Sequence, residues 1–200
     1  MQNDQFTKEV YVGEIFNNQN YSMQVHKRMR FEECIFRQSN FTEAVFHQCK
    51  FSECEFIDCN LSLLQLPQSS FMDVKFIGCK MLGINWTSAS WPSVKMAVSF
   101  AFERCILNDS SFFGLNLTEV KMAECRIHEA DFNEADCQGV DFTGSDLLHS
   151  TFHHTNLTDA NFTDSVNYSI NIFHNNIKNA KFTLPEAVSL LNSLDIELSE

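Results

Sequence analysis

The chain has 200 residues, with 26 acidic against 14 basic side chains and a formal net charge of −12. A charge of this sign disfavours nucleic acid as a partner and favours a basic protein surface. Six glycines and three prolines are too few for a flexible or collagen-like polymer, and no apolar run reaches the ~18 residues of a membrane-spanning helix.

Residues 1–28 follow a period of five only weakly. Met1–Asp4 is polar and no apolar leader follows it, so we expect no signal peptide and a cytoplasmic protein. An aromatic side chain stands at every fifth position from Phe6 to Tyr21, but the residues two places before are large and polar, and burying them unpaired is costly. We expect this segment to be an N-terminal cap or an imperfect first coil.

From residue 29 to residue 183 the period of five is nearly continuous. An apolar residue, here called position i, recurs from Phe31 to Met96 and, after a change of phase, from Phe102 to Phe162. Position i−2 is small or a thiol nearly everywhere, and positions i−1, i+1 and i+2 are mostly polar. Neither a helix nor a strand places every fifth residue on one face, so the spacing predicts a repeat architecture.

The phase changes near residues 97–101. Met96 and Phe102 are six residues apart, which we interpret as one inserted residue, and Trp86, Trp91 and Pro92 precede the step. The change of phase requires a bulge or a small loop. An aromatic contact surface for a partner is the less favoured interpretation, because the bulge is needed whatever the protein does.

Residues 184–200 change to helical spacing, after a break at Asn167 and three further repeats at Ile172, Ile177 and Phe182. Thr183 and Glu186 have the spacing of a capping box, with Pro185 in the first turn. This predicts a short amphipathic helix that serves either as a lid over the last coil or as a dimer interface. Its apolar residues are Leu184, Val188, Leu190, Leu191, Leu194 and Ile196.

The run ADFNEADCQGVDFTGSDL, from Ala130 to Leu147, resembles the pentapeptide-repeat family, whose unit reads A(D/N)Lxx or C/S/A-x-F-x-x. The resemblance implies an all-β fold, a right-handed quadrilateral parallel β-helix with four pentapeptides per coil and with i and i−2 pointing inward. The eight cysteines agree with it, because seven lie at i−2 and Cys137 at i. No CxxC pair exists, so we expect reduced thiol ladders, no zinc site and no cofactor.

The ending also carries a resemblance. SLLNSLDI, at residues 189–196, resembles the C-terminal module of the gyrase-interacting members, which include the Qnr quinolone-resistance proteins. Phrases such as CKMLGINWTSA place the chain nearest the albicidin self-resistance branch of that group. The resemblance implies a homodimer joined through the C-terminal helix, and an acidic rod that mimics DNA, binds DNA gyrase, a type II topoisomerase, and protects it from a poison such as albicidin or a quinolone.

Acidic side chains supply the candidate contacts. With twenty residues per coil, Glu33, Glu53 and Asp73 fall in one outward column, which we extend to Glu134. A second set, with Glu119, Glu124, Glu129 and Glu134 at i+2 and aspartates at i−1, forms an acidic belt around the coil. Spread over a rod of about 40 Å, a net charge of −12 is half of the roughly 24 charges of duplex DNA. The candidate partner-binding residues are Glu33, Glu53, Asp73, Glu119, Glu124, Glu129, Asp131, Glu134 and Asp136.

Other functions remain as alternatives. The acids could form an ordinary solvated surface, and the repeat could be a scaffold for another protein partner; a polysaccharide- or ice-binding face is disfavoured because the outward columns are mixed. His154 and His174 fall in a column with Glu134, and we interpret them as a surface ladder rather than a metal site. No nucleophile motif or phosphate-binding loop occurs, so no enzyme is expected.

Overall fold

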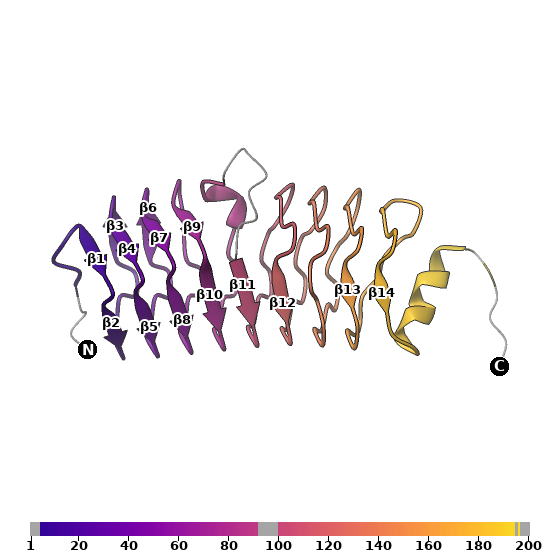
Figure 1. The fold of residues 1–200 in the computed structure, drawn as a ribbon, viewed down its shortest axis with the longest axis horizontal. Helices are drawn as coiled ribbons and strands as arrows, with labels where there is room; N and C mark the ends of the chain where they lie inside the picture. Colours follow the sequence, from indigo (N-terminus) through magenta and orange to yellow (C-terminus); the bar gives the residue numbers. More distant parts are fainter. Residues whose placement is uncertain (1–4, 92–99, 195, 197–200) are drawn as a thin grey trace.

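The computed structural model describes residues 5–91, 100–194 and 196, and it shows a single parallel β-solenoid (Figure 1). Short strands stack along one long axis, with the N-terminus at one end and a helix near the other. Four stacks of strands or bridges form the four faces, and parallel pairing joins residues twenty apart in most of the rod. The predicted β-helix is confirmed.

The strands are short because each face of a coil lasts only three or four residues before a corner. Phe36 and Phe56 show the pairing, since they are partners in adjacent strands of one face. The strands are β1 (Val10–Val12), β2 (Ile15–Asn17), β3 (Val25–Lys27), β4 (Arg30–Glu32), β5 (Ile35–Arg37), β6 (Val45–His47), β7 (Lys50–Ser52), β8 (Glu55–Ile57), β9 (Ser70–Met72), β10 (Val74–Ile77), β11 (Phe100–Glu103), β12 (Lys121–Ala123), β13 (Asn161–Phe162) and β14 (Lys181–Phe182).

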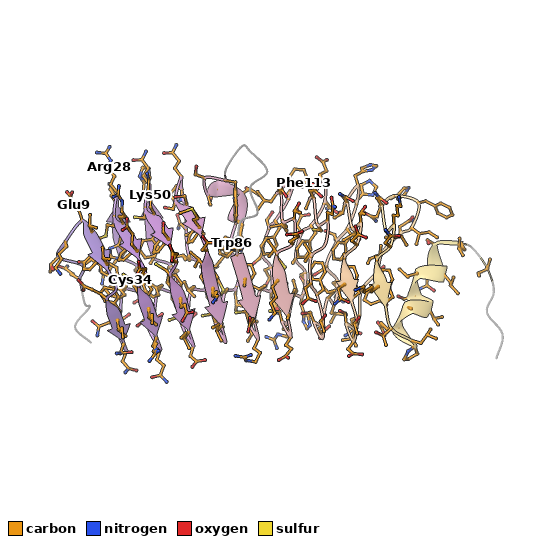
Figure 2. All side chains as sticks on the ribbon, viewed as in Figure 1. Glu9, Arg28, Cys34, Lys50, Trp86 and Phe113 are labelled. Carbon is orange, nitrogen blue, oxygen red and sulfur yellow. The ribbon has the colours of Figure 1, made fainter. Side chains whose placement is uncertain are left out.

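The core is a set of aromatic columns. Phe41, Phe51 and Phe142 are all buried, as the period of five predicts. On one face the rings of Phe36 and Phe56 stack with centroids 4.6 Å apart. Each such side chain contributes roughly 1.5–3 kcal/mol by leaving water. Figure 2 shows the same division in the sticks, with Trp86 inside the solenoid and Phe113 outside it.

Small polar groups at i−2 join successive coils inside the core. Cys59 Sγ donates to the carbonyl of Phe36 at 3.4 Å, and Ser69 Oγ donates to the carbonyl of Phe46 at 2.7 Å. The Ser69 hydroxyl also accepts from the Cys49 N–H at 2.9 Å. All eight cysteines are free and buried, and burial raises the pKa of the Cys137 thiol. The inward thiols are confirmed, and they act as weak donors as well as small apolar groups.

The corners have a backbone conformation that sequence reasoning missed. Position i+2 has positive φ at most corners of the described coils, for example 53° at Glu53 and 55° at Glu129. At many corners the i+3 N–H donates to the i carbonyl, as from Ala44 to Phe41 at 3.0 Å. A β-turn of this kind with positive φ at its third residue has the requirement of type II. The signal was available, because all six glycines of the chain stand at i+2.

The change of phase comes from six residues rather than one. Phe76 pairs with Phe102, and Lys80 with Ile106, so this coil is 26 residues long. A count modulo five cannot distinguish an insertion of one residue from an insertion of six. Ser90 N still donates to the Ser69 carbonyl in the regular pattern, and Phe100 pairs with Val74. The extra residues therefore lie between Trp91 and Phe100, and Met96 and most of the predicted step at 97–101 fall outside the described residues.

Trp86 is fully buried, at the start of the 3₁₀ helix η1 (Trp86–Ser88). Its ring is nearly parallel to that of Phe112, with centroids 6.1 Å apart, and its carbonyl accepts from the half-buried Trp91 Nε1 at 2.8 Å. Trp86 therefore belongs to the core and not to an exposed aromatic surface.

The C-terminal helix forms, as the 3₁₀ helix η2 (Glu186–Leu194), but the expected capping box does not. Thr183 Oγ1 accepts from the Asp164 N–H at 3.0 Å, and Glu186 Oε1 accepts from the Asn167 N–H at 2.6 Å. Both side chains satisfy backbone donors of the preceding coil instead of the helix's own N–H groups. Leu190 packs against the core, so the helix covers the last coil.

The last repeats are less regular than the sequence predicts. Tyr168 is buried, with its ring centroid 5.5 Å from that of Phe162, whereas Asn167 is exposed. Ile172 and Ile177 are only half-buried. Phe182 is half-buried too, but its ring stacks on that of Phe162 with centroids 5.0 Å apart.

Candidate partner-binding surface

The net charge lies almost wholly in the C-terminal half. Residues 1–101 contain 10 acidic and 9 basic residues, a net charge of −1, and residues 102–200 contain 16 and 5, a net charge of −11. Exposed cations such as Arg28 and Lys50 project from the N-terminal half (Figure 2). The negative charge is therefore concentrated in one half of the rod, which the total charge alone did not indicate.

Local charge density in the C-terminal half is close to that of DNA. Residues 102–170 carry 12 acidic and 3 basic side chains over about three and a half coils, or ~17 Å at ~4.8 Å per coil. Duplex DNA carries roughly ten charges over that length, against a net charge of −9 here. Averaging the net charge over the whole rod gives half the charge density of DNA, which underestimates the charge density of this segment.

The four glutamates of the acidic belt project from the four corners of the solenoid. Glu119, Glu124, Glu129 and Glu134 are all exposed at position i+2, with φ between 54° and 62°. Each occupies a different corner because consecutive pentapeptides turn onto successive faces. The corner backbone therefore directs one carboxylate outward on every side of this coil.

One predicted column is correct only in its first part. Glu33, Glu53 and Asp73 are exposed and in register through the pairing of β4, β7 and β9. Because the long coil takes 26 residues, their column continues through Glu119, whose Cγ lies 3.5 Å from the place of a Cβ on Gly139. It does not reach Glu134. That residue shares a different corner with Gly114 and His154.

Asp131 and Asp136 serve the fold as well as the surface. An Oδ1 of Asp131 accepts from the Asn133 N–H at 2.9 Å, and Asp136 Oδ1 accepts from Asn156 Nδ2 at 2.7 Å. The same position in other repeats holds Asn, as in Asn156, whose Oδ1 accepts from Thr158 Oγ1 at 2.7 Å. The bond from the Asn133 N–H to Asp131 is an Asx turn, whereas the bond from Asn156 to Asp136 joins side chains of adjacent coils. The two aspartates are half-buried, so they are less available to a partner than the corner glutamates.

Asp146 also serves both the fold and the surface, and its hydrogen bonds shift the pKa of its carboxyl group. Burial alone raises its pKa, but hydrogen bonds from Asn167 Nδ2 at 2.8 Å and from His128 Nε2 at 2.7 Å, with the charge of His128, lower it overall. The carboxylate form is therefore favoured.

The residues predicted for the dimer interface divide into two groups. Leu184, Val188, Leu194 and Ile196 are exposed, Leu184 by 76%. Leu190 and Leu191 are half-buried, and Leu190 packs against the core. An exposed apolar group on the outer side of η2 is compatible with both a lid and an interface, and a dimer stays a prediction.

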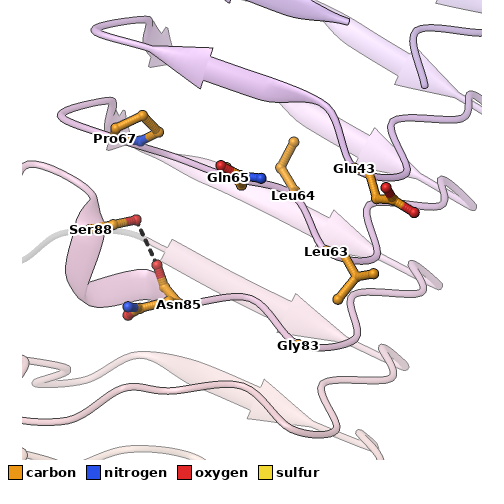
Figure 3. A pocket seen from close by; sticks show the side chains of 8 residues that line it. All are labelled: Glu43, Leu63, Leu64, Gln65, Pro67, Gly83, Asn85 and Ser88. Carbon is orange, nitrogen blue, oxygen red and sulfur yellow. Dashed lines mark hydrogen bonds between the residues drawn. The ribbon is translucent and has the colours of Figure 1, made fainter. Parts of the chain in front are cut away.

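A shallow groove of about 540 Å³ opens on the N-terminal half (Figure 3). Gly83 and Leu63 both line it, and the absence of a side chain on Gly83 leaves room for Leu63, because a Cβ there would come within 2.9 Å of Leu63 Cδ2. Glu43 is the one acidic residue that lines it. Within the described residues, no helix has the length and apolar character needed to cross a membrane.

Comparison with known proteins identifies the repeat. A profile of the pentapeptide repeat region matches residues 29–100 and 85–162, and comparison with curated proteins finds no match. The solved structure of HetL, a pentapeptide repeat protein involved in heterocyst differentiation regulation from Nostoc sp. strain PCC 7120, is similar, with a TM-score of 0.57, 13% identity and 87% of each chain covered. Full-length QnrB1, a plasmid-mediated fluoroquinolone resistance protein, gives a TM-score of 0.46 and 15% identity over 94% of this chain and 100% of QnrB1. Because the profile covers well over half of the sequence, the chain belongs to the pentapeptide-repeat family.

Proposed function

We propose that this protein binds the basic DNA-binding surface of a type II topoisomerase, DNA gyrase, through its acidic C-terminal half, and thereby protects the enzyme from a poison such as albicidin or a quinolone. The single observation that carries the proposal is the concentration of charge, net −11 within residues 102–200. The resemblance of the sequence to the gyrase-interacting group supplies the identity of the partner.

The physical basis is electrostatic complementarity. A surface built to hold DNA attracts a rod whose local charge density is near that of a duplex, and such attraction raises the association rate more than it raises final affinity. Exposed carboxylates at Glu119, Glu124, Glu129 and Glu134 are the principal contacts that we propose. Glu33, Glu53 and Asp73 extend the column of Glu119 toward the N-terminus and form a second, sparser set.

The proposed homodimer strengthens the match. If the exposed side of η2, with Val188 and Leu194, joins two copies tail to tail, the two acidic halves become one central segment. The nearly neutral N-terminal halves then lie at the two ends. Such a dimer would present twice the length of dense negative charge that a monomer presents.

The test is supercoiling of relaxed plasmid by gyrase in the presence of the poison, with and without this protein. We expect the protein to restore supercoiling at poison concentrations that otherwise stop it. Absence of both protection and binding would overturn the proposal. Recovery of a different protein partner, with no effect on gyrase, would instead support the scaffold alternative.

A further inference from the structure

Three imidazole rings gather at one corner near the C-terminal end of the rod. His153 and His154 stand at i+1 and i+2 of the repeat centred on Phe152, and His174 lies one coil further on. The His154 N–H donates to the His174 carbonyl at 2.9 Å, which fixes the two residues on adjacent rungs. Ring centroids are 4.1 Å apart for His153 and His154, 5.0 Å for His153 and His174, and 6.3 Å for His154 and His174.

These separations suit a chelated transition-metal ion. A Zn²⁺–N bond is about 2.0–2.1 Å, which puts the ring centre about 3 Å from the ion, so two imidazoles on one tetrahedral ion have centres about 5 Å apart. His153 and His174 are already at that separation. Imidazole is a preferred ligand of Zn²⁺, Ni²⁺ and Cu²⁺, whereas Mg²⁺ and Ca²⁺ prefer oxygen.

We propose that His174, together with His153 or His154, forms a surface binding site for a divalent transition-metal ion such as Zn²⁺ or Ni²⁺. Among the described residues, no three His, Cys, Asp or Glu side chains are already arranged around one ion. The proposed site consists of a pair of imidazoles, and water molecules fill the remaining coordination positions of the ion. All three rings are exposed on a backbone held by the solenoid, so they turn toward an ion without disturbing the core.

From the sequence, the column of Glu134, His154 and His174 was interpreted as a surface ladder rather than a metal site, and the structure adds a ligand that the column does not contain. Position i+2 places Glu134, His154 and His174 in one column, but the ring that approaches His174 to 5.0 Å is His153, from position i+1. A second imidazole favours a borderline ion more than a carboxylate does. The site does not depend on the proposed binding to topoisomerase, because the metal measurement uses this protein alone.

Isothermal titration with ZnCl₂ and with NiCl₂ tests the proposal, and MgCl₂ measures the general attraction of cations to an acidic rod. We expect saturable binding of one Zn²⁺ or Ni²⁺ per chain and no comparable binding of Mg²⁺. His174→Ala should weaken binding at least tenfold. His149→Ala is the matched control, since His149 is an equally exposed corner residue on another corner, and it should leave binding unchanged.

Two results would overturn the site. One is the absence of saturable Zn²⁺ or Ni²⁺ binding by the wild-type protein. The other is equal binding by wild type and His174→Ala, or an equal loss in His149→Ala, since either shows that the ion is not held by this imidazole pair.

Discussion

Phe76 lies directly against Phe102 in the next strand of one face, although 26 residues separate them. The strands pair in register, and the rings are stacked with centroids 5.4 Å apart. The neighbouring pairs Phe56–Phe76 and Phe102–Met122 are each twenty residues apart. The six additional residues therefore leave the register of this face unbroken, and the corner columns of the two halves stay aligned.

The aromatic columns predict a sharp contrast between two adjacent phenylalanines. Phe112 is fully buried and stacks on Phe132 at 5.0 Å, whereas Phe113 is 45% exposed. Phe112→Ala should lower the free energy of unfolding by about 3–5 kcal/mol, because it leaves a cavity between coils. Phe113→Ala, the matched control, should change it by less than about 0.5 kcal/mol. Urea unfolding followed by circular dichroism measures both, and equal losses would contradict the inward assignment of position i.

The hydroxyl of Ser69 provides a test of the bonds between coils. Ser69→Ala leaves the Cys49 N–H and the Phe46 carbonyl without their buried partner, at a cost of about 1–3 kcal/mol. Ser69→Cys keeps a weaker donor and acceptor, of the kind that Cys49 supplies one coil earlier, and should cost less. The comparison is made by thermal or urea unfolding. A Cys variant that is no more stable than the Ala variant would show that shape alone decides this position.

His26 predicts a dependence of stability on pH. Burial lowers the pKa of His26 from 6.5 to about 4, with the ring packed against Phe6, Tyr21 and Phe46. Between these values the unfolded chain takes up a proton that the folded chain does not. The neutral His26 ring therefore makes its full contribution to the free energy of unfolding above about pH 6.5. As the pH falls toward 4, the free energy of unfolding decreases by at most about 3 kcal/mol.

The control for this prediction is His26→Phe, which places the common core residue at the same position. The variant should lose the part of the acid destabilisation that His26 causes. Melting temperatures at about pH 7.5 and about pH 5 measure the difference. The same decrease in both proteins would mean that other groups account for the pH dependence.

A charge introduced on the exposed side of η2 should have a different effect from one introduced on its buried side. Val188→Glu and Leu194→Glu alter exposed side chains, so they should turn a dimer into monomers with little change in stability. Leu190→Glu alters a residue packed on the last coil and should instead loosen the lid. Sedimentation velocity gives the oligomeric state and thermal unfolding gives the stability. A wild-type protein that is monomeric, or variants with an unchanged sedimentation coefficient, would reject the interface.

Much of the fold was predictable because one geometric rule repeats. The coil of twenty residues that the family resemblance implies puts each position i above another, so the burial of Phe31 through Phe162 and of the i−2 thiols followed from the spacing and the resemblance together. The outward place of position i−1 was predictable for the same reason. Its Asx turns were not predictable, because Asn and Asp at i−1 could equally have faced solvent. The predictions failed where the period of five is interrupted, at Asn167, and where it ends, at Thr183 and Glu186.

The arrangement of the candidate surface could not be read from the period. A phase count modulo five concealed five of the six inserted residues, which sent the column of Asp73 to Glu134 instead of Glu119. The capping-box pattern of Thr183 and Glu186 was genuine in sequence, but donors at Asp164 and Asn167 compete for the same oxygens and are supplied only by the fold. The charge asymmetry between halves, in contrast, was present in the sequence and required only that the halves be counted separately.

The central claim is that the acidic C-terminal half makes the contact with gyrase, and the most direct measurement compares two matched sets of substitutions. One variant carries Glu119→Gln, Glu124→Gln, Glu129→Gln and Glu134→Gln. The other carries Glu33→Gln, Glu43→Gln, Glu53→Gln and Asp73→Asn. Each removes four charges from exposed corner positions with positive φ, so the two remove equal charge from the same kind of backbone position in different halves.

Binding of immobilised gyrase by both variants and by wild type is measured at about 50 and about 200 mM salt, where screening of a charged contact differs. We predict that the C-terminal variant loses at least tenfold in affinity and most of its salt dependence, and that the N-terminal variant loses clearly less. Equal affinity of the C-terminal variant and wild type, or a loss confined to the N-terminal variant, would contradict the account.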